Sequence, residues 1–132
     1  MSIFLERKNG ELHFDGFNLS DVAKKFSTPC YVYSKNLITE NFKAYNRSFR
    51  SKKSLICYAV KANPNIAILQ LLAELGAGFD VTSEGELNRV IYAGGDPKKI
   101  IFSGVGKSKA DIRQGLCLLY TSDAADETGR VG

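Results

Sequence analysis

Strand-like and helix-like segments alternate three times between residues 54 and 116, and this alternation limits the possible folds more than any other feature of the sequence. The expected strands are residues 54–60, 78–82 and 99–103, which are rich in β-branched and aromatic side chains. Helices are expected between them, and a third helix begins near residue 108. Strands and helices in alternation, joined by short loops with glycine, predict a parallel sheet with right-handed crossovers. Such a sheet is part of either a doubly wound α/β domain or a (β/α) barrel.

Each of the two expected inner helices has an apolar face and a glycine at its end. In the helix expected over residues 64–75, the apolar positions recur at helical spacing and are Ile68, Leu69, Leu71, Leu72 and Leu75. In the helix expected over residues 84–93, they are Leu87, Val90 and Ile91. Gly76 and the pair Gly94-Gly95 are expected to end these helices.

The first part of the chain has a different pattern. Asn9-Gly10 and Asp15-Gly16 are turn dipeptides, and they predict a short pair of strands before residue 17. A short helix is expected over residues 21–26, with Ser20 as its cap.

Two further elements are expected before the alternation begins. The sequence "PCYVYS" at 29–34 has the composition of a strand. A helix is expected to follow over residues 37–49, with either Ser34 or Asn36 as its cap.

Charge and cysteine content exclude several classes of protein. The formal charge of +4 over 132 residues is scattered, and the one dense run, residues 47–53, is interpreted as a solvated helix end and loop, so no nucleic-acid partner is expected. The three cysteines are far apart, which predicts neither a metal site nor a disulfide framework. The apolar run at the amino terminus is too short for a signal peptide or a membrane anchor. We therefore expect a cytoplasmic protein.

Lys61 stands at the carboxyl end of the strand expected over residues 54–60. In a (β/α) barrel, catalytic groups lie at such strand ends. By alternation Lys61 shares a face with Ala59 and Cys57, and a partly desolvated lysine there has a lowered pKa and can attack an aldehyde to form a Schiff base. Pyridoxal phosphate is the cofactor that uses this linkage. The competing interpretation is an ammonium group that simply emerges into solvent.

Three motifs in order, "YAVKAN" at 58–63, "ELGAGFDVTSEGEL" at 74–87 and "KIIFSGVGKS" at 99–108, resemble the start of the diaminopimelate decarboxylase family. This family belongs to the fold-type III, alanine-racemase-like enzymes. The resemblance implies an α/β fold, the amino-terminal part of a (β/α)8 TIM barrel with about three βα units, preceded by a strand segment of the family's β domain. It also implies pyridoxal 5'-phosphate as cofactor.

The same resemblance implies roles for three residues. Lys61 would be the catalytic lysine that holds the cofactor, and Asp80 and Glu86 would lie near the cofactor and its lysine. Two alternatives stay open for the acids, namely a turn carboxylate at Asp80 and a charge that favours the helix dipole at Glu86.

The implied activity is decarboxylation of meso-diaminopimelate to L-lysine by a homodimer, and we expect the present chain alone to be inactive. The expected domains are residues 1–29 (β segment), residues 30–116 (partial barrel) and residues 117–132, where Cys117 to Glu127 resembles a translated sequencing adapter and not a protein family. A fold-type III ornithine or arginine decarboxylase and a noncatalytic pyridoxal phosphate homeostasis protein are the alternatives.

Overall fold

A computed structural model describes residues 4–49, 54–104, 108–109 and 112–113. The chain divides into two compact units, Met1–Ala44 and Tyr45–Gly132. The expected third helix, the loop after residue 104 and the expected non-native tail lie wholly or largely outside the described residues.

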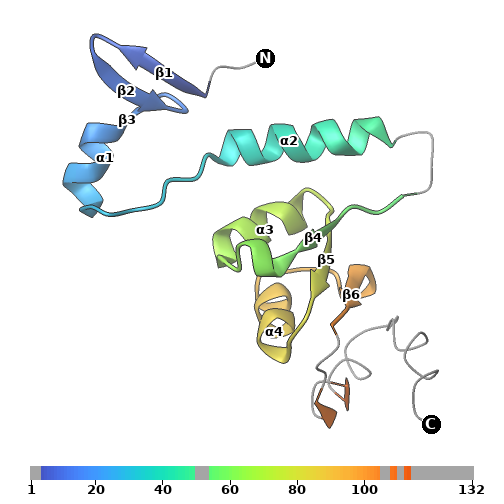
Figure 1. The fold of residues 1–132 in the computed structure, drawn as a ribbon. Coiled ribbons are helices and arrows are strands. Elements are labelled where there is room, and N and C mark those ends of the chain that lie inside the picture. Colours follow the sequence, from blue (N-terminus) through green and yellow to red (C-terminus); the bar gives the residue numbers. More distant parts are fainter. Residues whose placement is uncertain (1–3, 50–53, 105–107, 110–111, 114–132) are drawn as a thin grey trace. The chain divides into compact units, whose positions relative to one another are not determined.

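The first unit begins with a three-stranded antiparallel sheet, β1 (Leu5–Lys8), β2 (Glu11–Phe14) and β3 (Phe17–Asn18), in the order β1-β2-β3 (Figure 1). Both connecting turns consist of two residues with positive φ, 49° and 83° at Asn9-Gly10 and 51° and 84° at Asp15-Gly16. Two positive φ angles in succession are typical of the tight turns whose twist matches a hairpin, and Asn, Asp and Gly adopt them most easily. The two dipeptides therefore make the turns that the sequence predicts.

The helix α1 (Leu19–Phe26) begins two residues earlier than expected. The side chain of Asn18 caps it, because its Oδ1 accepts a hydrogen bond from the backbone N–H of Ser20 at 2.8 Å. The prediction that Ser20 is the cap was wrong. Asparagine caps helices as well as serine does, and Asn18 already has the extended backbone that a cap needs.

The strand predicted at 29–34 is also absent, because these residues form no regular element. A strand needs a neighbour to complete its hydrogen bonds, and none of the described strands pairs with this segment. Its β-branched and aromatic side chains are exposed, and Tyr31 is 91% exposed.

The helix α2 (Lys35–Ser48) follows, and Ser34 caps it, since Ser34 Oγ accepts a hydrogen bond from the Leu37 N–H at 2.9 Å. Of the two candidate caps, Ser34 is therefore confirmed. Ser34 Oγ also donates to Asp15 Oδ2 at 2.7 Å, and Asn36 Nδ2 donates to Asp15 Oδ1 at 3.1 Å. Asp15 thus ties a turn of the hairpin to the start of α2 within the first unit.

The second unit contains a parallel sheet in the order β4-β5-β6, formed by β4 (Cys57–Ala59), β5 (Gly78–Val81) and β6 (Ile100–Phe102). Two short 3-10 turns, η1 (Val60–Ala62) after β4 and η2 (Pro97–Lys99) before β6, each take up one residue of a predicted strand, Val60 and Lys99. In both strand pairs, the residues that lie opposite each other are 21 positions apart in the sequence: Cys57 lies opposite Gly78, and Phe79 lies opposite Ile100. The predicted parallel alternation is confirmed, with shorter strands.

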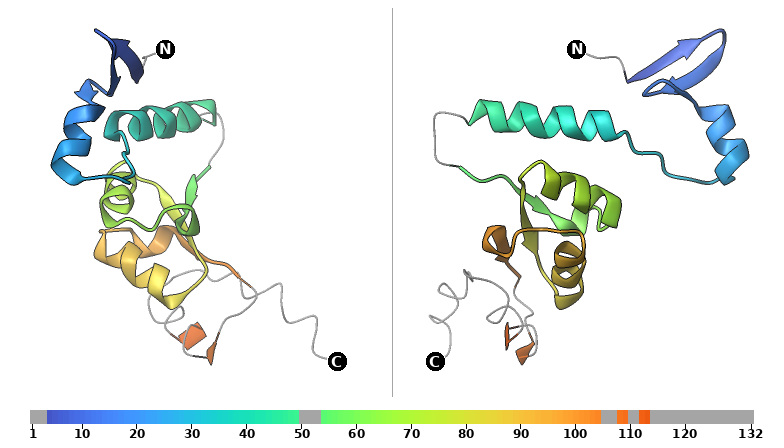
Figure 2. Two further views of the ribbon diagram at one scale, coloured as in Figure 1. Left: turned by 60° about the vertical axis from the view of Figure 1, so that its left-hand side comes forward. Right: turned by 180° about the vertical axis from the view of Figure 1, so that it is seen from behind.

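The helices α3 (Ile66–Glu74) and α4 (Glu84–Tyr92) pack against each other and lie on the same side of this sheet (Figures 1 and 2). The core between helices and sheet consists of apolar side chains that are almost completely buried, the largest being Phe79, Leu69, Leu87, Ile100, Val60, Val81 and Val90. Of the predicted helix faces, Leu75 and Ile91 are only half-buried, and the other positions are buried.

Both helices end at the predicted glycines. After α3, the Ala77 N–H donates to the Leu72 carbonyl at 3.0 Å and the Gly76 N–H donates to the Ala73 carbonyl at 2.9 Å, while Gly76 has a φ of 86°. This is the Schellman arrangement, which needs a left-handed residue after the helix. The end of α4 repeats it at Gly94, with a φ of 84°. These ends turn the chain into β5 and toward β6.

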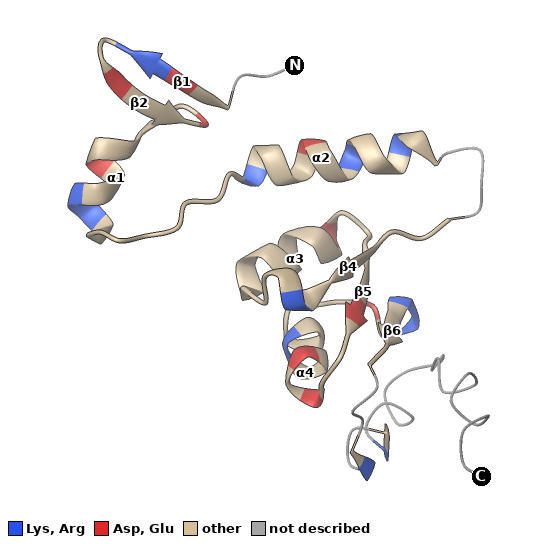
Figure 3. Cartoon of the chain, viewed as in Figure 1, with Lys and Arg blue, Asp and Glu red and all other residues tan. Residues whose placement is uncertain are grey.

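Lysine and arginine are distributed along both units (Figure 3). Part of the dense basic run predicted at 47–53 lies outside the described residues. Among the described helices, none is long and apolar enough to cross a membrane.

Candidate active site

The predicted site residues lie along the carboxyl ends of the parallel strands. Lys61 is in η1, directly after β4, and Asp80 is the third residue of β5. Glu86 is in the first turn of α4, which follows β5. The turn η1 lies beside β5, so Lys61 and Asp80 belong to neighbouring segments. Parallel α/β folds bind their ligands at this edge of the sheet, so polar side chains there are candidate ligand contacts.

The two faces of the sheet differ in burial. Phe79, Val81, Ile100 and Phe102 face the helices and are buried. The opposite face carries a row in register, Ala59 opposite Asp80 and Asp80 opposite Ile101, and all three are half-buried. The face with Asp80 is therefore partly accessible within the described residues.

Lys61 is exposed, and among the described residues its ammonium group has no ion-pair partner. The expected partial desolvation is therefore not found in the described part of the chain. The strand β4 ends at Ala59, and Lys61 lies in the 3-10 turn η1 that follows it. The alternation of side chains along a strand therefore does not set the direction of the Lys61 side chain.

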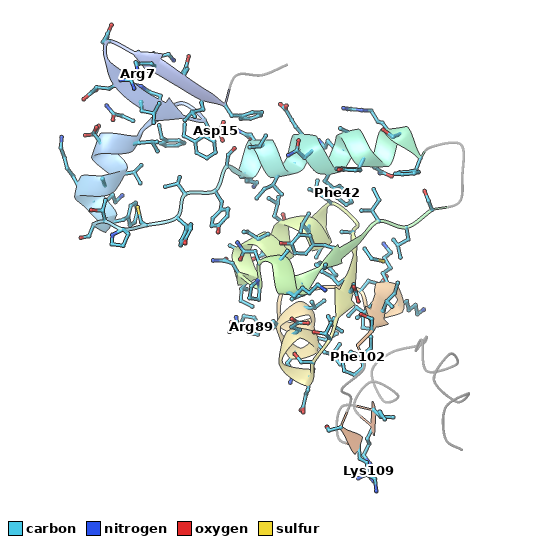
Figure 4. All side chains as sticks on the ribbon, in the orientation of Figure 1. Arg7, Asp15, Phe42, Arg89, Phe102 and Lys109 are labelled. Atoms are coloured by element: carbon cyan, nitrogen blue, oxygen red, sulfur yellow. The ribbon has the colours of Figure 1, made fainter. Side chains whose placement is uncertain are left out.

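The segment that follows Lys61 is held by side-chain hydrogen bonds. Asn63 Oδ1 accepts from the Asn65 N–H at 3.0 Å, and Asn65 Oδ1 accepts from the Ala67 N–H at 3.0 Å and so caps α3. Arg89, which projects from α4 in Figure 4, donates from Nη1 to the Pro64 carbonyl at 3.5 Å. The lysine is thus followed by a turn that both neighbouring helices fix.

Asp80 has a partner that the sequence did not reveal. Ser103, one residue beyond β6, donates from Oγ to Asp80 Oδ1 at 2.5 Å. The same carboxylate acts on Cys57, whose thiol pKa is raised first by burial and second by the negative charge of Asp80. A neutral thiol therefore lies beside a hydrogen-bonded carboxylate on the half-buried face.

Glu86 stabilises the start of α4, whose N-cap is Ser83. Its Oε2 accepts from the Thr82 N–H at 2.7 Å and from Thr82 Oγ1 at 3.1 Å, and Ser83 Oγ accepts from the Glu86 N–H at 3.2 Å. This reciprocal pattern resembles a capping box, and a negative charge in the first turn also favours the helix dipole. Sequence reasoning anticipated the dipole, and the serine with a glutamate three residues later was the signal for the cap.

The sequence profile described as "pyridoxal-dependent decarboxylase, pyridoxal binding domain" matches residues 35–119. The chain belongs to the pyridoxal-dependent decarboxylase family. The match includes all three predicted site residues, and it extends three residues past the expected boundary at Leu116.

Individual members of the pyridoxal-dependent decarboxylase family resemble the chain closely. A diaminopimelate decarboxylase of Pseudomonas aeruginosa is 50% identical over 109 residues, which is 83% of this chain and 26% of that protein. The crystal structure of the M. jannaschii diaminopimelate decarboxylase in complex with L-lysine has a TM-score of 0.83 at 39% identity, covering 86% of this chain and 28% of that one. A lysine decarboxylase from Selenomonas ruminantium has a TM-score of 0.69 at 32% identity, covering 76% and 27%.

The chain therefore spans about a quarter of the length of these decarboxylases. The predicted fold class is confirmed, since the described parallel βα units match fold-type III decarboxylases over most of the chain.

Proposed function

We propose that the chain is the amino-terminal part of a diaminopimelate decarboxylase, which converts meso-diaminopimelate to L-lysine and carbon dioxide. The observation that carries this proposal is the 50% identity to a diaminopimelate decarboxylase over most of the chain. Among the solved structures, the identity is 39% for the M. jannaschii diaminopimelate decarboxylase and 32% for the lysine decarboxylase, which favours diaminopimelate as the parent's substrate.

The expected domain organisation belongs to this proposal. Residues 1–29 would be part of the β domain, residues 30–116 would be the first βα units of the cofactor-binding barrel, and residues 117–132 would be foreign to it. The parent enzyme would be a cytoplasmic homodimer that binds a small amino acid. The present chain alone would have no turnover, because it spans only about a quarter of its relatives.

The residues of this chain meet one requirement for binding pyridoxal phosphate, which is a primary amine that can bond to its aldehyde. The cofactor needs a primary amine at the carboxyl edge of the parallel sheet, and Lys61 supplies an exposed one. When bound, pyridoxal phosphate supplies an aldehyde for that amine and a ring that takes up the electron pair released by decarboxylation.

The other predicted residues act around that amine. Asp80 places its carboxyl group on the half-buried face beside η1, and the small side chain of Ala59 leaves space next to it. Glu86 fixes the start of α4 by holding Thr82. In this proposal, Lys61 binds the cofactor, Asp80 adjusts the charge near it, and Glu86 shapes the adjoining loop.

The test is to add pyridoxal phosphate to the purified chain, reduce with borohydride and locate the pyridoxyl group by mass spectrometry. We expect Lys61 to be labelled more than any other lysine, and Lys61→Ala to lose only that label. Lys43→Ala, in α2 of the first unit, is the matched control and should leave the Lys61 label unchanged. Equal labelling of all exposed lysines would contradict a site at Lys61.

A further inference from the structure

The hydrogen bond between Ser103 and Asp80 links two strands at the carboxyl edge of the sheet. Asp80 lies opposite Ile101, and Ser103 stands two residues further, so its side chain emerges on the same face as Asp80. The two residues are 23 positions apart in sequence, and the oxygen atoms are 2.5 Å apart. A hydrogen bond to a charged carboxylate is stronger than one between neutral groups.

The backbone fixes Ser103 at this place. The Ser103 N–H donates to the Val81 carbonyl at 2.9 Å, which extends the pairing of β5 and β6 one residue beyond β6. Gly104 follows with a φ of 111°, and its backbone lies close to Thr82. Ser103 therefore contacts β5 through both its backbone and its hydroxyl group.

Within the described part of the chain, Ser103 occupies one oxygen of Asp80 and leaves the other available. Among the described residues, no second hydrogen-bond donor reaches the Asp80 carboxylate. Since η1 lies beside β5, the available oxygen belongs to the strand next to the turn that carries Lys61.

We infer that Ser103 is a positioning residue that holds the Asp80 carboxylate for the reaction of Lys61 with the aldehyde of pyridoxal phosphate. This inference rests on the proposed function. In that reaction, the Lys61 nitrogen bonds to the aldehyde carbon, the carbon–oxygen bond breaks, and the oxygen leaves as water with two protons from the nitrogen. A fixed carboxylate accepts the first of these protons and passes it to the departing oxygen, which is general acid–base catalysis.

The test compares Ser103→Ala and Ser103→Thr in the complete chain. Ser103→Ala removes the hydroxyl group, whereas Ser103→Thr keeps it. Ser20→Ala is the matched control, because among the described residues the Ser20 hydroxyl group has no hydrogen-bond partner. The first readout is the rate at which the reducible pyridoxyl adduct forms at Lys61.

We expect Ser103→Ala to slow adduct formation at Lys61 about fivefold, the factor that one typical hydrogen bond represents. Ser103→Thr and Ser20→Ala should keep the wild-type rate. Asp80→Asn should slow the reaction at least as much, and adding Ser103→Ala to it should cause no further loss. A wild-type rate in Ser103→Ala, or equal losses in the alanine and threonine variants, would overturn the inference.

A second readout does not depend on the cofactor. The 13C signal of the Asp80 carboxyl group should shift in Ser103→Ala and stay near its wild-type position in Ser103→Thr. An unchanged signal in Ser103→Ala would overturn the inference whatever the labelling shows. A wild-type chain without selective labelling at Lys61 would contradict the assignment of Lys61 as the cofactor site in the proposed function and would overturn the catalytic part of the inference. The carboxyl signal would still show whether Ser103 holds Asp80.

Discussion

Replacing Gly78 with alanine should destabilise the second unit. A Cβ atom at this position would lie 2.6 Å from the Lys99 carbonyl oxygen, 2.7 Å from Cys57 Sγ and 3.0 Å from Leu55 Cδ2. The sulfur atom can rotate away, but the carbonyl oxygen belongs to the backbone between η2 and β6. The methyl group would therefore push two neighbouring strands apart.

The expected loss follows from two opposing effects. Forcing an extra methyl group into a packed site costs about 1–3 kcal/mol, and a contact with backbone belongs in the upper half of that range. Replacing glycine with alanine also restricts the unfolded chain, which returns about 0.4–1 kcal/mol. We expect a net loss of about 2 kcal/mol, measured as a lower urea midpoint by far-UV circular dichroism with an unchanged slope.

Gly85 provides the matched control, because a Cβ atom there would meet only Ser83 Oγ, at 4.0 Å. Gly85→Ala lies within α4 and should stabilise the chain by about 0.5–1 kcal/mol, since glycine is a poor helix former. Adding Gly78→Ala to Cys57→Ala should cost less stability than Gly78→Ala costs in the wild-type chain, because the contact with the sulfur atom is gone. It should still cost some, because the contact with the Lys99 carbonyl oxygen remains. An unchanged midpoint for Gly78→Ala, or a loss of the same size for Gly85→Ala, would refute this reasoning.

Three further predictions concern other parts of the chain. Hydrogen bonds from Ser34, and to a smaller extent from Asn36, lower the pKa of Asp15 from its ordinary value of 3.8. The Asp15 carboxylate therefore stabilises the first unit fully above about pH 4, and this stabilisation is lost as the pH falls through the lowered pKa. Asp15→Asn should remove this acid dependence in circular dichroism titrations, and an identical titration in both proteins would argue against it. Leu69→Ala should cost about 2–5 kcal/mol, because the side chain is completely buried, and thermal melting that stays unchanged would contradict this. Ser83→Ala should cost about 1 kcal/mol in urea unfolding through loss of the α4 cap, and Ser83→Thr should cost less; equal losses would show that the hydroxyl group does not matter.

The alternation of strands and helices could be predicted because its signals are local. The apolar spacing in α3 and the glycine at its end lie within one stretch of about a dozen residues, and both predictions agree with the structure. The strand predicted at 29–34 failed for the opposite reason. Its composition favours an extended chain, but only a neighbouring strand can make it part of a sheet, and composition says nothing about that neighbour.

The site could be predicted only in part. The motif around Lys61 located the lysine at the carboxyl end of β4, but its exposure depends on what covers the sheet, which no local pattern records. The link between Asp80 and Ser103 requires the register of β5 with β6. With residue 80 placed opposite residue 101, Ser103 follows at once as a neighbour on the same face.

The equal spacing of the strand pairs has a consequence for how such a chain folds during synthesis. Each new strand of the parallel sheet pairs with one that left the ribosome 21 residues earlier, and the intervening helix α4 packs on β5. Short sequence separations between partners allow fast assembly, because little chain entropy is lost in bringing them together. The sheet can therefore grow one βα unit at a time in the order of translation, with every step closing a loop of the same length.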